Sequence, residues 1–426
     1  MSLLLSTATE SGGNLYVTLL SLGLVIIIGM YAGKLFEKFK IPHITGYLVA
    51  GILIGPSVFG IVSHESMTGL SIVVNIALGF IAYGIGSEII FRNLKETGIQ
   101  VVIITLLQAL FAVIFVLVAV WVVGAPLWLA LILGAIATAT APGPIMALTK
   151  KYKAKGPVTS TMLPLVGLDD AIGIVVFGVL LSIGASMYTG GDSSFIELIK
   201  APLMEILLSL VVGISIGLLV KLALKLQKNP NNEYILVVSV VAIIMSVALA
   251  QVGVFGQHLS IILTPMIAGM TFANTVKDSQ LHKTVGVIDS FSPVILIAFF
   301  TLAGSHLDLS VLTNLNGGTG DIGVSVAVLT VLYIVARIIG KMSGAWFGAV
   351  VTKAHPNVRK WLGITLLPQA GVAIGMANAA NSTLQGEAGT TIMTIVLAAT
   401  VVYELFGPFG VKIALQKSGE IDESTL

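Results

Sequence analysis

Two interrupted segments lie within otherwise apolar stretches: AIATATAPGPIMAL at residues 135–148 and GITLLPQAGVAIGMA at residues 363–377. The first contains Pro142 and Pro144, and the second contains Pro368 followed by glycines. A proline inside a helix removes a backbone donor and displaces a carbonyl from its helical hydrogen bond. In hydrocarbon such a break persists mainly where the backbone lines a cavity enclosed by protein, because an unsatisfied polar group is costly there. A simple proline kink also explains either segment alone, so the interpretation depends on the surroundings.

The composition indicates that these surroundings are hydrocarbon. Of the 426 residues, 56% are hydrophobic and only 10% are charged, whereas soluble domains carry about a quarter charged residues. The mean hydropathy is +1.03, and apolar stretches of roughly 20 residues, long enough to cross a bilayer, recur from end to end. Cysteine is absent and the six histidines lack ligand spacing, which argues against disulfides, zinc sites and redox chemistry. We expect an integral membrane protein without a soluble domain, a cofactor, an enzymatic activity or a nucleic-acid partner.

Thirteen stretches are predicted to cross the membrane, and the basic residues orient them. The spans lie near residues 14–34, 41–62, 69–90, 99–123, 126–149, 158–185, 199–225, 233–251, 256–275, 286–307, 322–350, 358–380 and 388–415. Of the 22 lysines and arginines, Lys200 follows an even-numbered span and two lie inside the eleventh span; the other 19 follow odd-numbered spans or lie in the C-terminal end. Because basic residues collect in cytoplasmic loops, the sequence predicts an outside N-terminus and a cytoplasmic C-terminus, in what we expect to be a prokaryotic cell membrane.

The two interrupted segments hold the same place in two blocks of three spans. Each is the middle of its block, which is formed by spans 4–6 (about residues 99–185) or by spans 11–13 (about residues 322–415). The blocks lie seven spans apart, an odd number, so they have opposite orientations. Inverted repeats with paired interrupted helices indicate the central ion site of a transporter. We predict an all-α polytopic protein with inverted repeats and two broken crossing helices, whose ends offer carbonyls to a cation.

Asp169 and Asp170 lie in the middle of the sixth predicted span, in LPLVGLDDAIGIVVFG. A carboxylate at this depth costs roughly 2.5 to 3.5 kcal/mol on insertion scales, so it suggests a function by default. Neighbouring helix residues diverge by about 100°, so the two carboxylates can share one cavity and still face different helices. Burial and mutual repulsion both disfavour a second negative charge. The pair is therefore predicted to bind either protons or a hard cation. A structural pair, with one salt bridge and one hydrogen bond, is the alternative.

Arg337 and Lys341, in VARIIGKMSG of the eleventh predicted span, stand one helical turn apart on one face. Two buried cations on one face are expected to find carboxylates. Lysine loses its proton readily when buried, whereas arginine stays charged. We therefore interpret Arg337 as a partner in a permanent structural pair. Lys341 is either structural or a switchable partner that releases its proton when the site changes occupancy.

Three further polar residues belong to the interrupted segments. Thr138 and Thr140 flank the first break and are expected to offer hydroxyl or carbonyl oxygens to a cation, and Gln369 holds the matching place in the second break. Glu88 and Glu404 lie near predicted span ends, where a carboxylate can reach the interface or pair with a basic residue. The acidic C-terminal stretch GEIDESTL is expected to be a solvated end.

Several strings together carry a resemblance to a known family. IPHITGYLVAGILIGP is similar to a second-helix signature, KAKGPVTSTMLPLVGLDDAIGIVVFG to an ion-site region, and LLPQAGVAIGMA to a second crossing helix, all of the monovalent cation/proton antiporter superfamily. With the double aspartate, the chain resembles the two-aspartate (NapA/NhaA-like) branch over nearly its whole length. The resemblance implies a homodimer in which spans 4–6 and 11–13 form a mobile ion-transport core. The remaining spans would form a dimerisation and scaffold domain, within a single transporter unit over residues 1–426.

The resemblance also implies residue roles. Asp170 matches the principal cation and proton carrier, and Asp169 matches the residue that pairs with a lysine on the eleventh span, here Lys341. Arg337 matches an arginine of the electroneutral branch, so the stoichiometry stays open. Ala141 stands in ATAP, where many electroneutral members carry an acidic residue. One cation is therefore expected to bind mainly at Asp170.

The predicted function is secondary active exchange of sodium or lithium for protons, with both competing for the aspartate pair. Potassium/proton exchange, or potassium efflux of the Kef type, is the first alternative, although no GxGxxG unit signals the nucleotide-binding domain usual in Kef-type relatives. An organic-anion carrier on a similar scaffold would have to explain the clustered carboxylates. A non-transporting sensor or scaffold subunit would show no flux.

Overall fold

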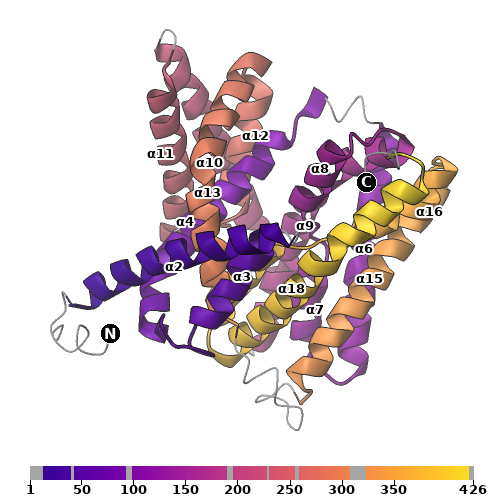
Figure 1. The fold of residues 1–426 in the computed structure, drawn as a ribbon, viewed down its shortest axis with the longest axis horizontal. Helices are drawn as coiled ribbons and strands as arrows, with labels where there is room; N and C mark the ends of the chain where they lie inside the picture. Colours follow the sequence, from indigo (N-terminus) through magenta and orange to yellow (C-terminus); the bar gives the residue numbers. More distant parts are fainter. Residues whose placement is uncertain are drawn as a thin grey trace.

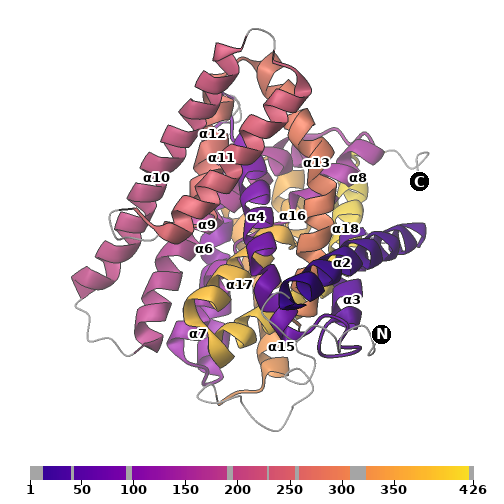
Figure 2. The same cartoon turned by 90° about the vertical axis from the view of Figure 1, so that its left-hand side faces the viewer.

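The computed structural model describes residues 13–39, 43–92, 98–189, 195–227, 230–254, 259–307 and 323–421. Within these ranges the chain forms a bundle of helices that run at varied angles to one another (Figures 1 and 2). The helices are α2 (Gly13–Lys38), α3 (His43–Ile54), α4 (His64–Glu88), α6 (Ile99–Val122), α7 (Leu127–Ile136), α8 (Pro142–Lys151), α9 (Pro157–Tyr188), α10 (Phe195–Leu226), α11 (Asn232–Val252), α12 (Leu263–Thr275), α13 (Asp278–Ser305), α15 (Val326–Val351), α16 (Pro356–Thr365), α17 (Gly371–Leu384) and α18 (Gly386–Lys417).

The helices confirm that the chain is an integral membrane protein. In the described ranges, nine are long and apolar enough to cross a bilayer, namely α2, α4, α6, α9, α10, α11, α13, α15 and α18, and the shorter α3 and α7 are also apolar. A helix or a pair of half-helices lies at each of the thirteen predicted spans. The number of membrane crossings itself stays a prediction.

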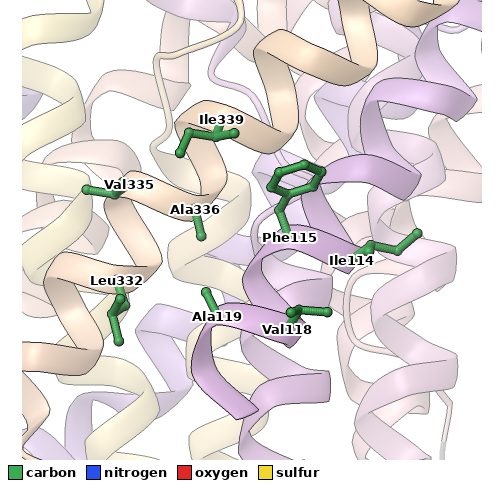
Figure 3. A pocket seen from close by; sticks show the side chains of 8 residues that line it. All are labelled: Ile114, Phe115, Val118, Ala119, Leu332, Val335, Ala336 and Ile339. Atoms are coloured by element: carbon green, nitrogen blue, oxygen red, sulfur yellow. The ribbon is translucent and has the colours of Figure 1, made fainter. Parts of the chain in front are cut away.

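The outer surface of the bundle is apolar. A groove of about 400 Å³ lies between α6 and α15 (Figure 3), and the described residues that line it are Ile114, Phe115, Val118, Ala119, Leu332, Val335, Ala336 and Ile339. Several of these side chains are about half exposed. A contiguous apolar surface of this kind requires a non-aqueous neighbour, which agrees with lipid as the surrounding solvent.

Two predicted spans are each broken into two half-helices, as expected. Residues 137–141 separate α7 from α8, and residues 366–370 separate α16 from α17. The two breaks touch, because the backbone N–H of Ala141 donates to the carbonyl of Pro368 at 2.9 Å. Pro142 is the first residue of α8, where a missing N–H costs nothing. The chain thus brings four half-helix ends to one place.

The two blocks of three spans have matching element boundaries. The starts of α7 and α16 (127 and 356) differ by 229 residues, as do their ends (136 and 365). The same offset separates the starts of α8 and α17 and both ends of α9 and α18. The last residues of α6 and α15 also differ by this number. A constant offset means that the two blocks are structural repeats without insertions in these elements.

Glycines bring the two repeats into close contact along α6 and α15. A Cβ atom added at Gly340, Gly344 or Gly348 would lie between 2.6 and 2.9 Å from a Cα atom of α6. Only glycine permits this approach, as in the small-residue interfaces common between membrane helices. Gly344 packs directly on the Cα of Gln108. The cationic face of α15 therefore lies close to α6 and to the first break.

The described helices pack as two groups. One contains α2, α3, α4 and α10 to α13, and the other contains both repeats, α6 to α9 and α15 to α18. The main contacts between the groups are those of α9 with α10 and α4, of α17 with α4, and of α18 with α3. In Figure 1, α10, α11 and α13 lie at the upper left, while α6, α15 and α16 lie at the right.

Candidate functional site

Asp169 and Asp170 lie in the middle of α9, beside the first break. Both are buried, with exposed fractions of 0% and 1%. Their helix is interrupted by nothing but Pro164, and it faces α6, α7 and α17. Because adjacent helix residues point about 100° apart, the two carboxyl groups have different neighbours. These neighbours make the two aspartates chemically unequal.

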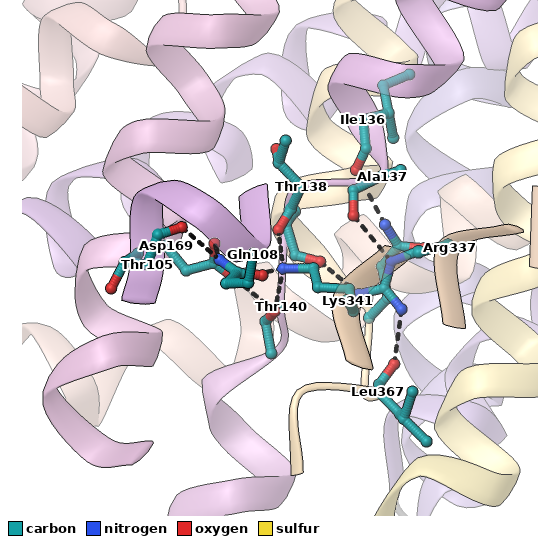
Figure 4. A network of polar contacts seen from close by, with 12 residues as sticks. Thr105, Gln108, Ile136, Ala137, Thr138, Thr140, Asp169, Arg337, Lys341 and Leu367 are labelled. Atoms are coloured by element: carbon teal, nitrogen blue, oxygen red, sulfur yellow. Dashed lines mark hydrogen bonds and ion pairs between the residues drawn. The ribbon is translucent and has the colours of Figure 1, made fainter. Parts of the chain in front are cut away.

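Asp169 is fully satisfied by partners from three other segments (Figure 4). Its Oδ2 lies 2.6 Å from the Nζ of Lys341 and accepts from the hydroxyl of Thr140 at 2.5 Å. Its Oδ1 accepts a hydrogen bond from the side-chain amide of Gln108. A buried carboxylate is stable only when it is paired and hydrogen-bonded in this way.

Lys341 uses all three N–H groups of its ammonium to donate hydrogen bonds within the same cluster. Its Nζ donates to Asp169, to the Thr140 hydroxyl at 2.9 Å and to the backbone carbonyl of Thr138. Thr138 and Thr140 belong to the non-helical residues between α7 and α8. The first break therefore supplies a carbonyl and a hydroxyl oxygen, as the sequence suggested, but both face the lysine here.

Gln108 was not singled out from the sequence, although it is the side-chain amide that binds Asp169. It is completely buried in α6, and its Nε2 also donates to the carbonyl of Thr105. An amide near the middle of a strongly apolar span was a usable signal. Its partner could not be read from the sequence, because the contact spans 61 residues and depends on how α6 is rotated.

Asp170 has a free acceptor. The backbone N–H of Thr140 interacts with its carboxyl group, but its Oδ1 has no hydrogen-bond partner among the described residues. A buried, unpartnered carboxylate oxygen is costly. A proton or a cation bound to this oxygen would remove the cost.

Arg337 differs from the sequence-based expectation, because it forms no ion pair with a carboxylate in the described part of the chain. Its guanidinium instead donates to the carbonyls of Ala137 at 3.0 Å, Ala139 at 2.7 Å and Leu367 at 2.8 Å. It also lies 4.5 Å from the ring centre of Tyr403. The carbonyl ends of α7 and α16 carry partial negative charge. These carbonyls therefore balance the charge of Arg337, a role that we expected a carboxylate to have.

Gln369 lies in the second break, but its side chain hydrogen-bonds to α7 and α15 rather than to the aspartates. Its Nε2 donates to the carbonyl of Ile136, the last residue of α7, at 3.0 Å, and its amide group also exchanges a hydrogen bond with the hydroxyl of Tyr333. Pro368, next to it, packs against Gly407 of α18 and accepts from Ala141. The second break thus holds the first in place through these hydrogen bonds.

A cavity of about 160 Å³ adjoins both breaks. Thr140 and the residues on either side of it line it from the first break, together with the residues that open α17. The opposite wall consists of apolar side chains from α3, α4 and α13, among them Ile44, Ile81 and Phe300. The cavity lies where the two helix groups meet. It is large enough for a few water molecules, and it reaches the threonine that contacts both aspartates.

The expectation that Glu404 lies near a span end is wrong. It lies well inside α18, thirteen residues before the helix ends at Lys417, and it is completely buried. Neither of its carboxyl oxygens has a hydrogen-bond partner among the described residues. Glu88, in contrast, is the exposed last residue of α4, as expected for a carboxylate at a helix end.

Charged groups at crossed helix breaks inside hydrocarbon are expensive, and secondary transporters are the proteins that use them. That is the class defined by the fold and the site. A profile of the family described as "Sodium/hydrogen exchanger, transmembrane" matches residues 23–416. The chain therefore belongs to the sodium/hydrogen exchanger family, which confirms the resemblance seen in the sequence.

Individual relatives agree with this assignment. The chain is 22% identical over 394 residues to the ammonium/H⁺ antiporter subunit AmhT of Alkalihalophilus pseudofirmus, covering 92% of this chain and 93% of that protein. It is also similar in structure to the sodium/proton antiporter MjNhaP1 from Methanocaldococcus jannaschii at pH 8, with a TM-score of 0.75 and 20% identity over 96% of this chain and all of that one. A second structure of MjNhaP1 gives a TM-score of 0.71 at 19% identity, over 94% and 98% of the two chains. At these identities the structural likeness shows the fold alone. Together with the family, it makes the chain a cation/proton antiporter.

Proposed function

We propose that the chain exchanges sodium or lithium for protons by alternating access, and that cation and protons compete at Asp169 and Asp170. The observation that carries the proposal is the inequality of the two aspartates. Asp169 is neutralised by Lys341, whereas Asp170 is buried with a free oxygen. The cluster therefore has one carboxyl group whose charge only a transported ion can balance.

This inequality provides the coupling between the two ions. An empty, ionised Asp170 would have to be carried through a low-dielectric interior without a partner, which costs far more than moving a neutral site. The loaded or protonated site can move, and the empty site cannot. Hard oxygen ligands suit sodium and lithium. The carboxylate of Asp170 and the hydroxyl and carbonyl oxygens near Thr138 and Thr140 are of this kind.

Lys341 would set the stoichiometry. If the incoming cation draws Asp169 into its ligand shell, Lys341 loses its counter-charge and releases its own proton, so two protons move per cation. If the Asp169–Lys341 pair stays closed, one proton moves and exchange is electroneutral. Arg337 plays no part in this step, because its contacts are to backbone carbonyls.

We propose that both repeats (about residues 99–185 and 322–415) move together as the transport core against a scaffold formed by the other helices, which also forms a homodimer. Three observations support this division: the two groups of helices, the narrow contacts between them and the small cavity at their junction. The proposed setting is a prokaryotic cell membrane, with the N-terminus outside.

Potassium/proton or ammonium/proton exchange is the second candidate function. It includes potassium efflux of the Kef type. The observation that favours it is the relative named as an ammonium/H⁺ antiporter subunit, which matches over nearly the whole chain. Oxygen ligands do not exclude the larger potassium and ammonium ions, so ligand type alone does not separate the two candidates.

The deciding experiment uses the purified protein in liposomes. Internal pH is followed with a dye while sodium, lithium, potassium or ammonium is added outside. Because cation entry drives protons out, the proposal predicts alkalinisation of the interior that depends on sodium or lithium and is absent in Asp170→Asn. Flux with potassium or ammonium alone would favour the second candidate, and flux that persists in Asp170→Asn would refute the site. Repeating the assay with a clamped membrane potential measures the stoichiometry.

A further inference from the structure

The C-terminal turn of the described chain, residues 418–421, buries Glu420 and Ile421, whereas the sequence suggested a solvated end; residues 422–426 of that stretch lie outside the described ranges. The turn lies against the N-terminus of α9, the helix that carries both aspartates. Glu420 is only 7% exposed, and Ile421 packs in a core cluster that also contains Val158 and Met162 of α9. The end of the second repeat therefore touches the start of the ion-site helix of the first.

The start of α9 has no cap of its own. Its N-cap residue is Gly156, which has no side chain to accept from the exposed backbone donors. The first backbone N–H groups of any helix lack partners inside the helix and carry partial positive charge. A helix that begins in this way needs an acceptor from elsewhere in the chain.

Glu420 supplies that acceptor. Its Oε1 accepts from the N–H of Val158 at 2.6 Å, and its Oε2 accepts from the N–H of Thr159 at 2.7 Å. The hydroxyl of Thr159 donates to Oε2 as well, at 2.7 Å. Hydrogen bonds to an ionised carboxylate are stronger than neutral ones. Both carboxylate oxygens are thus used by one helix end.

The local backbone conformation directs the side chain of Glu420 toward the N-terminus of α9. Gly419 has a φ of +74°, and α18 ends with hydrogen bonds from Gly419 to Gln416 and from Glu420 to Leu415, the glycine-dependent reversal that often ends helices. The carbonyl of Glu420 then accepts from Lys155, just before α9, at 3.1 Å. A Cβ atom on Gly156 would lie 2.5 Å from the Glu420 side chain, so this glycine leaves the space that the carboxylate fills.

The same turn also holds the second broken span. The side-chain amide of Asn357, in the first turn of α16, donates to the carbonyl of Ser418 at 3.0 Å. One short turn therefore joins the starts of α9 and α16 to the end of α18. These three helices come from both repeats.

We propose that Glu420 is a positioning residue of the transport core: its carboxylate caps α9 from outside the helix and fixes the height of the Asp169/Asp170 pair relative to the two breaks. The inference rests on the proposed function of that pair. Asp170 lies thirteen residues from Pro157, about 20 Å along the helix axis, and the backbone stays helical between them, with Pro164 as the one internal proline. A shift of the capped end is therefore transmitted to the aspartates.

The test compares Glu420→Gln with Glu420→Asp and with Glu387→Gln. The amide cannot accept at both of its ends, so Glu420→Gln is expected to raise the apparent KM for the transported cation about five-fold, the effect of losing one helix cap. Glu420→Asp, which keeps the charge on a shorter stem, is expected to recover part of the loss. Glu387 is an exposed glutamate in the first turn of α18, the repeat counterpart of α9, and its substitution is expected to leave KM unchanged.

A role limited to stability would give a different pattern. It would lower Vmax with the amount of folded protein and leave KM unchanged in every variant, and that result would overturn the proposal. Amide hydrogen exchange at residues 158–160 gives a reading that does not depend on which ion is carried. Faster exchange there in Glu420→Gln supports the cap, and unchanged exchange refutes it, whether or not the unmodified protein transports sodium.

Discussion

The two broken spans have the same length of first half-helix and the same place in their repeats, but their charged neighbours differ. The first break contacts an aspartate of α9 and both cations of α15, whereas the second contacts a cation through one carbonyl. The first break faces the aspartates of α9 through Thr140. The second break offers a carbonyl to Arg337 and uses Gln369 to hold α7. Duplication has thus produced matching helix ends, whereas the titratable groups differ between the copies.

The offset of 229 residues shows which residues of the second repeat occupy the positions of the aspartates. It relates Asp169 and Asp170 in α9 to Ala398 and Ala399 in α18. The counterparts of the carboxylates are therefore small apolar residues that only pack. The first repeat supplies the anions of the site, and its partner supplies none at the matching positions.

The cations show the reverse pattern. Arg337 and Lys341 of α15 correspond to Gln108 and Ala112 of α6. Because α6 and α15 pack closely, Lys341 crosses the repeat interface to reach Asp169 at 2.6 Å. One repeat provides both carboxyl groups, and the other neutralises one of them, Asp169. Two copies of one scaffold thus supply opposite charges to one buried cluster.

Removing the free carboxyl group should have the largest effect. We expect Asp170→Asn to lower cation/proton exchange at least about 100-fold, because a mid-membrane carboxylate has no substitute for balancing a cation. Liposome flux measures it. Asp278→Asn is the matched control, since Asp278 forms an exposed pair with Arg92 and such pairs contribute little. Equal loss in both variants would mean that the comparison of the breaks is irrelevant to transport.

Removing Arg337 should damage the fold more than the chemistry. Arg337→Met leaves the carbonyls of Ala137, Ala139 and Leu367 without their donor, and each unsatisfied buried group costs about 1 to 3 kcal/mol. We expect a large fall in the thermal unfolding temperature of the detergent-solubilised protein. Arg92→Met, on the surface, should change it little. A normal unfolding temperature in Arg337→Met would contradict the role assigned to the helix ends.

The pH dependence tests competition at the first break. A protonated Asp170 is neutral and does not attract a cation, so protons weaken cation binding. The apparent KM for the cation should therefore rise as pH falls, by about tenfold per pH unit where the protonated form dominates and one proton is displaced. Liposome flux at a series of pH values, with equal pH on both sides, measures it. A KM that is independent of pH would argue against a shared site.

Thr140 and Gln369 occupy equivalent positions in the two breaks, and substituting them should give the smallest effects on transport. Thr140→Val removes the hydroxyl that donates to Asp169 and accepts from Lys341, and we expect the apparent KM to rise about five-fold, as for the loss of about 1 kcal/mol, the net contribution of a typical hydrogen bond. Gln369→Leu, at the counterpart position, should lower stability without changing KM. Equal KM effects in the two variants would show that both breaks contact the ion.

Local signals in the sequence were sufficient for the breaks and the aspartates. Prolines inside an apolar stretch mark a helix break wherever the chain folds, and Asp169 and Asp170 are conspicuous because nothing else in their span is charged. The spacing of the two blocks also indicated the repeats. These features depend on neighbours in sequence, or on the count of spans.

The rest depended on contacts between distant segments. Arg337 was expected to need a carboxylate, and its real partners are backbone carbonyls, which no side-chain pattern reveals. Glu404 was placed near a span end although the predicted span, residues 388–415, already continued eleven residues beyond it, and its burial depends on how α18 packs. Glu420 was taken as solvated because its role requires the uncapped start of α9, 262 residues away from it in the case of Val158.

The most direct test of the central claim measures protons released when the cation binds to the purified protein in weakly buffered detergent solution. We expect sodium to release protons from the unmodified protein and from Gln369→Leu, and to release none from Asp170→Asn. Release that persists in Asp170→Asn, or that disappears in Gln369→Leu, would contradict the claim that the cation and the proton compete at the first break alone.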